Sequence, residues 1–284
     1  MTARPRVAIV VIVIAMATSA AATLTHGQSR KPAASRATPP AAPAPPAPAP
    51  AVERRVPFAP GETLAYEISW SSFLTAATAT VAVREKRPSF DSLAYYIVAE
   101  GQPTGLVAAL YRVYYKVDTL LDAFTLLPQR GSIYSQESRK PKLKSTRFNR
   151  AAREASYEIQ SGDPLKSEST RAFPVPADAQ DALSAVYALR AIDFKTGARF
   201  LMPIVLNGDI YRLQMTVGSR EQVQCGLGTL SAWRVTPVVL DERGQPDGRA
   251  MAIWFSDDAQ RLPLALEAEL PVGRFRLTLL RANR

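Results

Sequence analysis

The chain has 284 residues and a formal net charge of +10, from 35 Lys and Arg against 25 Asp and Glu. Seven of those basic residues and only one of the acidic residues precede Pro57, so residues 57–284 have an excess of only four positive charges. This small excess excludes a dedicated nucleic-acid-binding protein, which would need a concentrated basic surface. Cys225 is the only cysteine and His26 the only histidine, which excludes an intramolecular disulfide, a C-x-x-C redox pair and most zinc sites, so no metal or cofactor is expected.

The first 22 residues have the composition of an export signal. Arg4 and Arg6 make a positive start, residues 7–17 are apolar, and residues 20–22 are the small residues that signal peptidases accept. Residues 23–56 are rich in Ala and Pro and have few side chains to bury, so they are predicted to form a disordered tether. The protein is therefore expected in the periplasm or cell envelope, anchored in the inner membrane if the signal is not cleaved.

Residues 57–284 are predicted to form one mainly β domain. Leu64, Tyr66, Ile68 and Trp70 fall on alternate positions, which places them on one face of a strand. Further strands are expected at 79–84, 94–100, 112–121, 131–136, 156–160, 200–206, 210–217, 221–225, 229–240, 250–256, 264–270 and 274–281. The short connections rich in Gly, Pro, Asn and Asp predict antiparallel pairing.

One segment, residues 178–193, has helical periodicity. Its apolar residues recur at helical spacing, Asp178 or Asp181 is placed to cap its start, and Gly197 is placed to end it. The expected architecture is antiparallel sheets that form a curved sheet or partial barrel, with this main helix packed against it or capping it.

Three motifs occur together in this domain. They are Val56-Pro-Phe-Ala-Pro-Gly-Glu-Thr-Leu-Ala-Tyr66, Gln180-Asp-Ala-Leu-Ser-Ala-Val-Tyr-Ala-Leu-Arg190, and Ile253-Trp-Phe-Ser-Asp-Asp258 followed by Arg261-Leu-Pro263. In this order they resemble the exported bacterial family named Domain of Unknown Function 3108. The resemblance implies an envelope protein of Gram-negative-type bacteria with a largely β fold, and it implies neither an activity nor catalytic residues.

Tyrosines are concentrated in two neighbouring predicted strands, on either side of an apolar segment at 105–110 that is expected to be a short helix or lid. Adjacent residues on a strand face opposite ways, so one set of rings can fill the core while the other forms an outer surface or lines a pocket. The tyrosines predicted to contact a ligand are Tyr96, Tyr111 and Tyr114, together with Tyr187 from the helix.

One segment is strongly basic, and it is expected to be an exposed hairpin or loop. The residues predicted to contact an anionic surface are Arg139, Lys140, Lys142, Lys144 and Arg147, and Arg150 and Arg153 follow them. Such a segment is either a solvated, aggregation-resistant edge or a contact with lipid headgroups or polyanionic polysaccharide.

Three functions are compatible with these patterns. The leading hypothesis is a non-catalytic envelope protein that holds a lipid-like or other apolar ligand within its curved sheet. The alternative is a structural or interaction module that binds another envelope protein or the cell wall. The third is a hydrolase built on Asp178 with Asp181 or Asp257 with Asp258, although helix capping and turn formation also account for these pairs.

Overall fold

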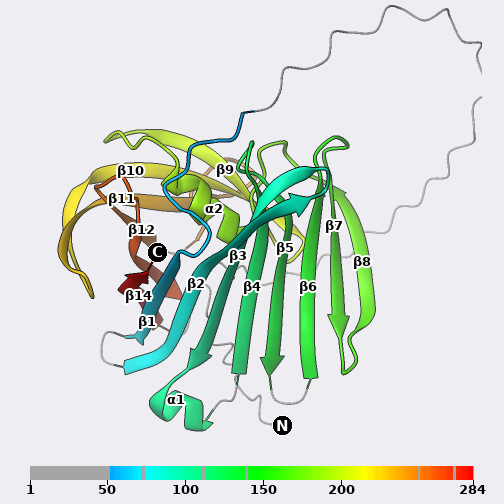
Figure 1. The fold of residues 1–284 in the computed structure, drawn as a ribbon, viewed down its shortest axis with the longest axis horizontal. Coiled ribbons are helices and arrows are strands. Elements are labelled where there is room, and N and C mark those ends of the chain that lie inside the picture. The colour runs from blue at the N-terminus through cyan, green and yellow to red at the C-terminus, as the bar shows by residue number, and fades with distance from the viewer. Residues whose placement is uncertain are drawn as a thin grey trace, which may run out of the picture.

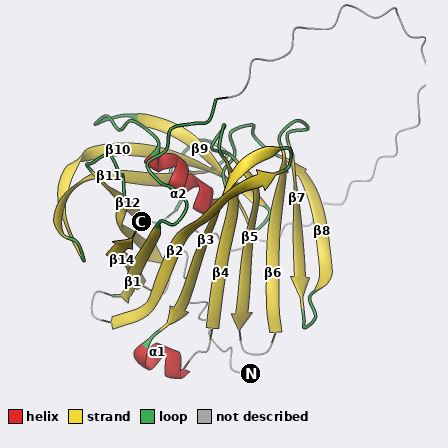
Figure 2. Cartoon of the chain, in the orientation of Figure 1, coloured by secondary structure: helices red, strands yellow, loops and turns green. Residues whose placement is uncertain are grey.

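The dominant feature of the protein is a single antiparallel sheet of 14 strands (Figures 1 and 2). The computed structural model describes residues 52–71, 74–110, 113–137, 140–248, 250–270 and 273–283. The predicted export signal and most of the predicted tether lie outside these residues. The last part of that tether lies against the domain: the Arg54 N–H donates to the Ala123 carbonyl at 2.9 Å, and Glu53 pairs with Lys86 at 2.8 Å.

The mainly β architecture predicted from the sequence is confirmed. The strands are β1 (Thr63–Trp70), β2 (Leu74–Ser89), β3 (Ser92–Pro103), β4 (Val113–Asp122), β5 (Pro128–Glu137), β6 (Lys140–Asn149), β7 (Glu154–Ser161), β8 (Lys166–Pro174), β9 (Arg199–Leu206), β10 (Asp209–Cys225), β11 (Gly228–Leu240), β12 (Met251–Ser256), β13 (Pro263–Leu270) and β14 (Gly273–Asn283). The described helices are α1 (Gly105–Leu110) and α2 (Ala182–Arg190).

The sheet has β8 and β9 at its two edges and β1 near its middle. Its order is β8-β7-β6-β5-β4-β3-β2-β1-β14-β13-β12-β11-β10-β9, so the first strand pairs with the last. The sheet curls along this order (Figure 1). At one end Arg171 of β8 donates to the carbonyl of Gly208, which follows β9, at 2.6 Å. The two edges therefore meet there, although the described residues form no β8–β9 ladder.

Helix α2 lies between the two halves of this curled sheet (Figure 2). Ala185 and Leu189 pack into an apolar cluster with strands β9 to β12. Leu183 and Tyr187 pack into a second cluster with β2, β3 and β4. Because the helix has apolar neighbours on both sides, eight of its nine residues are buried.

Several predicted elements are confirmed and others are corrected. Leu64, Tyr66 and Ile68 are buried on one face of β1, as their alternation predicts. The helix expected over 178–193 is shorter, because Asp181 caps its start and Ala191 ends it. The two strands expected at 210–217 and 221–225 are one continuous strand, β10, with a register shift between Val217 and Arg220.

The basic segment expected as a hairpin or loop is mostly strand β6, which pairs with β5 and β7 along its length. Strand β8 was not predicted at all. Seven of its nine residues are exposed in succession, with only Phe173 half-buried, so burial on one face imposes no alternation on this edge strand.

The turn after β10 packs directly against the backbone of β14, and this contact predicts a stability effect. The Gly226 N–H donates to the Leu279 carbonyl at 2.7 Å, and a Cβ at position 226 would overlap the backbone of Leu280. Gly226→Ala should therefore lower the free energy of unfolding by roughly 2 kcal/mol in urea titrations. The control is Gly218→Ala, whose Cβ would lie 3.3 Å from the Arg234 carbonyl, and equal losses for both variants would contradict the prediction.

Candidate functional site

An apolar cavity of about 100 Å³ lies between α2 and the sheet. Its walls come from β1, β2, β3, β12, β13 and β14, and from the face of α2 that carries Leu183, Val186 and Tyr187. Alanines occupy four of the lining positions, and their short side chains leave the space that larger residues would fill. These alanines are Ala79, Ala99, Ala182 and Ala265.

Tyr187 borders this cavity and is 1% exposed. Its ring meets the ring of Phe58 edge-on at 4.9 Å. Burial raises the pKa of Tyr187, and the neighbouring Arg190 guanidinium partly offsets this effect. Across the cavity, the Tyr66 hydroxyl donates to the Pro263 carbonyl at 2.9 Å. The cavity therefore has an apolar surface with phenol rings at its margin.

A buried ion pair fixes the C-terminal end of α2. Arg190 donates to both carboxylate oxygens of Glu62, at 2.5 and 2.8 Å, and the two side chains are 0% and 4% exposed. The Arg190 guanidinium also donates to the Gln260 carbonyl and lies over the rings of Phe58 and Tyr187. Although burial opposes the charged form, hydrogen bonding to Glu62 raises the pKa of Arg190. The cation also complements the negative end of the helix dipole.

Asp181 fixes the N-terminal end of the same helix. One carboxylate oxygen accepts from the Ser184 N–H at 2.8 Å, and the other accepts from the Thr119 hydroxyl of β4 at 2.6 Å. Burial raises the pKa of Asp181 to about 6, although these hydrogen bonds act in the opposite direction. Gly131 of β5 leaves room for the carboxylate, because a Cβ there would lie 2.7 Å from it.

Gln180, just before Asp181, connects β9 with the loop between β4 and β5 through hydrogen bonds. The Gln180 N–H donates to the Pro203 carbonyl, and its carbonyl accepts from the Val205 N–H, both at 2.8 Å. The Gln180 side chain donates to the Leu126 carbonyl at 3.0 Å. Gln180 and Glu62 were not expected to have a role from the sequence, although both lie in the motifs that carry the family resemblance.

The structure separates the tyrosines that were predicted to contact a ligand. Tyr187 lines the cavity, whereas Tyr111 lies outside the described residues. Tyr96 is adjacent to the buried Tyr95 on β3, so it faces away from α2, and Arg87 lies over its ring at 4.6 Å. Tyr114 also faces away, and its hydroxyl donates to Glu100 at 2.6 Å. That they contact a ligand stays a prediction.

The basic residues of β6 are divided between the two faces of the sheet. Lys142 and Lys144 share the face of the buried Phe148, and Lys144 donates to the Asn207 side chain at 3.0 Å. Arg147 is exposed on the opposite face. Arg139 and the side chain of Lys140 lie outside the described residues. Contact with an anionic surface stays a prediction for all five.

The four acids considered for catalysis have structural partners or separate positions. Asp178 is exposed, and the capping role expected of Asp181 is confirmed. Asp257 accepts from the Trp233 indole N–H at 2.6 Å and pairs with Arg220 at 2.6 Å and Arg261 at 3.8 Å. Asp258 accepts two backbone N–H groups in the turn before β13, as a turn residue is expected to.

Two features are absent from the part of the chain that the structure describes. Within those ranges, no three potential metal ligands among His, Cys, Asp and Glu come together. Neither described helix has the length and apolar character needed to cross a membrane.

Comparison with known proteins gives a family and a fold. The model of the family described as "Protein of unknown function (DUF3108)" matches residues 65–280. A crystal structure of a β-barrel-like protein of Domain of Unknown Function DUF1849 from Brucella abortus superposes with a TM-score of 0.50 at 11% identity, and covers 78% of this chain and 96% of that one. At this identity the likeness concerns the fold alone.

Two further solved structures resemble the chain less. One, from Bacteroides fragilis, is described as an exported protein with a YmcC-like fold (TM-score 0.33, 10% identity, 82% of this chain and 100% of that one). The other, from Parabacteroides distasonis, is described as a lipoprotein (TM-score 0.34, 9% identity, 82% and 100%). No protein of curated function matches the sequence.

The Glu62–Arg190 pair predicts an asymmetric response to substitution. Arg190→Met should lower the free energy of unfolding by roughly 3–5 kcal/mol, because it leaves the Glu62 carboxylate buried without a partner. The double variant Glu62→Gln/Arg190→Met should recover much of this loss in urea unfolding. Arg84→Met, which breaks an exposed pair with Glu100, is the control and should have a much smaller effect. A loss as small as that of the control would contradict the prediction.

Asp181 predicts a pH dependence of stability. Its folded pKa of about 6 lies above the ordinary value of 3.8, so between these values the folded protein binds more protons than the unfolded chain. Stability should therefore fall as pH rises from 4 to 6, by at most about 3 kcal/mol from this group. Asp181→Asn should remove this contribution in urea titrations at pH 4, 5, 6 and 7. Asp178→Asn is the control, and a wild-type slope in Asp181→Asn would contradict the assignment.

Proposed function

The chain belongs to the DUF3108 family of proteins of unknown function, and on that premise we propose that it is a non-catalytic envelope protein that binds an apolar group, such as the end of an acyl chain, beneath α2. The cavity between α2 and the sheet is the observation that carries this proposal. The export signal predicted over residues 1–22 supports the envelope location.

The size of the cavity limits what it can hold. A ligand pocket for a drug-sized molecule has a volume of roughly 300–1,000 Å³, whereas an engineered apolar cavity of about 150 Å³ holds benzene. A cavity of about 100 Å³ therefore accepts a short hydrocarbon segment, while the rest of a lipid would remain outside unless α2 moved. The proposed ligand accordingly inserts the last few carbons of a chain.

The chemistry of the walls favours hydrocarbon over a polar ligand. Each buried methylene contributes about 0.8 kcal/mol, so four of them contribute about 3 kcal/mol. The charged residue in the lining, Glu100, is paired with Arg84 and accepts from the Tyr114 hydroxyl, and Tyr66 is bonded to a backbone carbonyl. A polar group entering the cavity would lose its water without gaining an equivalent partner.

An interaction module is the second candidate, and strand β8 is the observation that favours it. Most of its residues are exposed on both faces, and among the described strands it pairs with β7 alone, so one row of backbone groups can pair with an extended segment of another chain. The third candidate, a carboxylate-based hydrolase, has no support from this geometry. Asp257 is engaged by arginine and indole partners, and Asp181 serves as a helix cap.

Filling the cavity should abolish ligand binding. Protein exported from its full-length gene and purified from the envelope fraction should release one acyl-chain compound per molecule on organic extraction, measured by mass spectrometry. Val186→Phe places a ring in the cavity and should release at least tenfold less, with a melting temperature close to that of the wild type.

The control is Val239→Phe, which enlarges a half-buried valine of β11 that does not line the cavity. It should release as much compound as the wild type. A wild-type protein that releases no compound, or a Val186→Phe variant that retains it, would exclude the proposed site. In the first case, capture of a partner that depends on β8 would favour the interaction module.

A further inference from the structure

A groove of about 670 Å³ lies apart from the cavity and shares no lining residue with it. Its walls are the turn between β2 and β3, the connection between β4 and β5, and the ends of β6 and β7 that adjoin their turn. Its volume falls within the range of roughly 300–1,000 Å³ that is usual for ligand sites. We call it the Phe90 groove, after the aromatic residue at its rim.

Phe90 is exposed in an unfavourable backbone conformation. Its φ is +48° and that of Asp91 is +62°, so a bulky residue occupies the first of two left-handed positions, where Asn and Gly are preferred. The side chain is nevertheless 53% exposed, so the strain is not compensated by burial of the ring. The two-residue turn between β2 and β3 accounts for the backbone conformation but not for the choice of an exposed Phe, and strained residues of this kind are enriched at functional positions.

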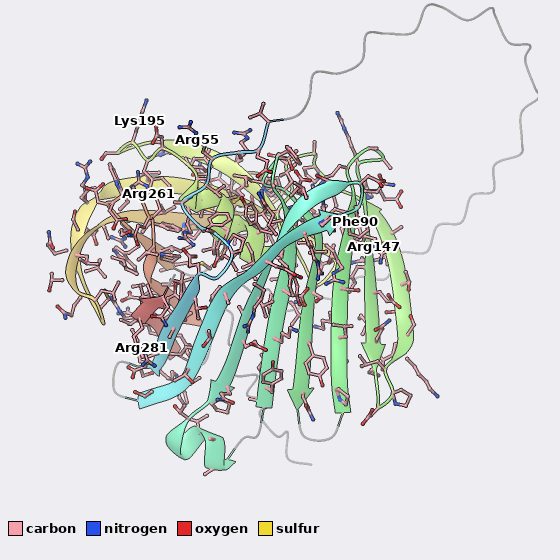
Figure 3. All side chains as sticks on the ribbon, in the orientation of Figure 1. Arg55, Phe90, Arg147, Lys195, Arg261 and Arg281 are labelled. Carbon is pink, nitrogen blue, oxygen red and sulfur yellow. The ribbon has the colours of Figure 1, made fainter. Side chains whose placement is uncertain are left out.

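Arg147 of β6 lies against this ring. Its guanidinium carbon is 5.6 Å from the ring centroid, and Figure 3 shows the two side chains side by side on the outside of the sheet. Within the described residues Arg147 forms no ion pair. The ring and the guanidinium together form a flat surface with hydrogen-bond donors at its edge.

The floor of the groove has buried polar atoms without protein partners in the described residues. The Gln129 amide donates to the Ser89 carbonyl and to Asp122, but its oxygen has no donor. The Nη2 of Arg150 donates to the carbonyls of Pro128 and Ala179, but its Nε has no acceptor. Both atoms are fully buried, so they add polarity to the wall of the groove without facing its open space.

From these observations we propose that the Phe90 groove is a saccharide-binding site. A sugar ring has a C–H face that packs on an exposed aromatic ring, and its hydroxyls can accept from the exposed Arg147 guanidinium beside Phe90. The two arginines of the groove are balanced by Asp122 and Glu154, which favours a neutral polyhydroxyl ligand over an anionic surface. The site is independent of the apolar cavity beneath α2.

The test uses the processed protein on an array of neutral and acidic oligosaccharides, followed by calorimetric titration with the strongest binder. Neutral oligosaccharides should bind, and Phe90→Asn should weaken binding about tenfold. The same variant should keep or raise the melting temperature, because Asn tolerates the left-handed backbone that strains Phe. A purely structural ring would instead give a lower melting temperature and unchanged affinity.

The matched control is Leu227→Asn, which replaces another exposed apolar residue at a hairpin turn and should leave affinity unchanged. If Phe90→Asn lowers the melting temperature, Arg147→Gln, which leaves the turn intact, must still weaken binding by several fold. The proposal is overturned if no oligosaccharide binds or if both variants bind as the wild type does. Arg147-dependent binding to phosphatidylglycerol vesicles without saccharide binding would overturn it in favour of a lipid surface.

Discussion

The position of α2 depends on a buried charge at each of its ends. Arg190 is paired with Glu62 beside the start of β1, and Asp181 is held by Thr119 of β4. Apolar packing is non-directional, so it would allow a short helix to shift between the two halves of the sheet. Desolvating these charges is unfavourable, but once buried they admit one position and orientation of the helix. The dimensions of the cavity follow from that position.

The domain thus has two separate spaces that differ in volume and in the polarity of the residues that line them. Beneath α2 the space is small, apolar and bordered by neutralised charge, which suits hydrocarbon. On the outside, the Phe90 groove is larger and lined by polar groups around one exposed ring. Hydrocarbon and glycan need different surfaces, and an apolar cavity and a polar groove occur on this one sheet without a shared lining residue. Occupying one need not disturb the other.

The fold was largely predictable because burial on one face imposes alternation, as in β1, and helical spacing distinguishes α2 from the strands. Strand β8 escaped prediction since it buries almost nothing on either face. The site was harder to predict. Glu62 and Arg190 are 128 residues apart, so their pairing depends on topology rather than on local sequence. Among the tyrosines, alternation correctly separates the two faces of β3 but does not tell which face meets α2.

The pairing of β1 with β14 has a consequence for how the chain folds. Strands β1 to β8 follow one another across the sheet, so each can pair with the preceding strand as soon as it is synthesised or exported. Until the last residues arrive, however, β1 is an open edge, and the second half of the sheet has nothing to join. Any event that halts synthesis or transport before β14 would leave an unfinished sheet with an apolar, pairing-competent strand exposed to other chains. Pairing of the C-terminal strand with β1 is therefore the step that completes the sheet.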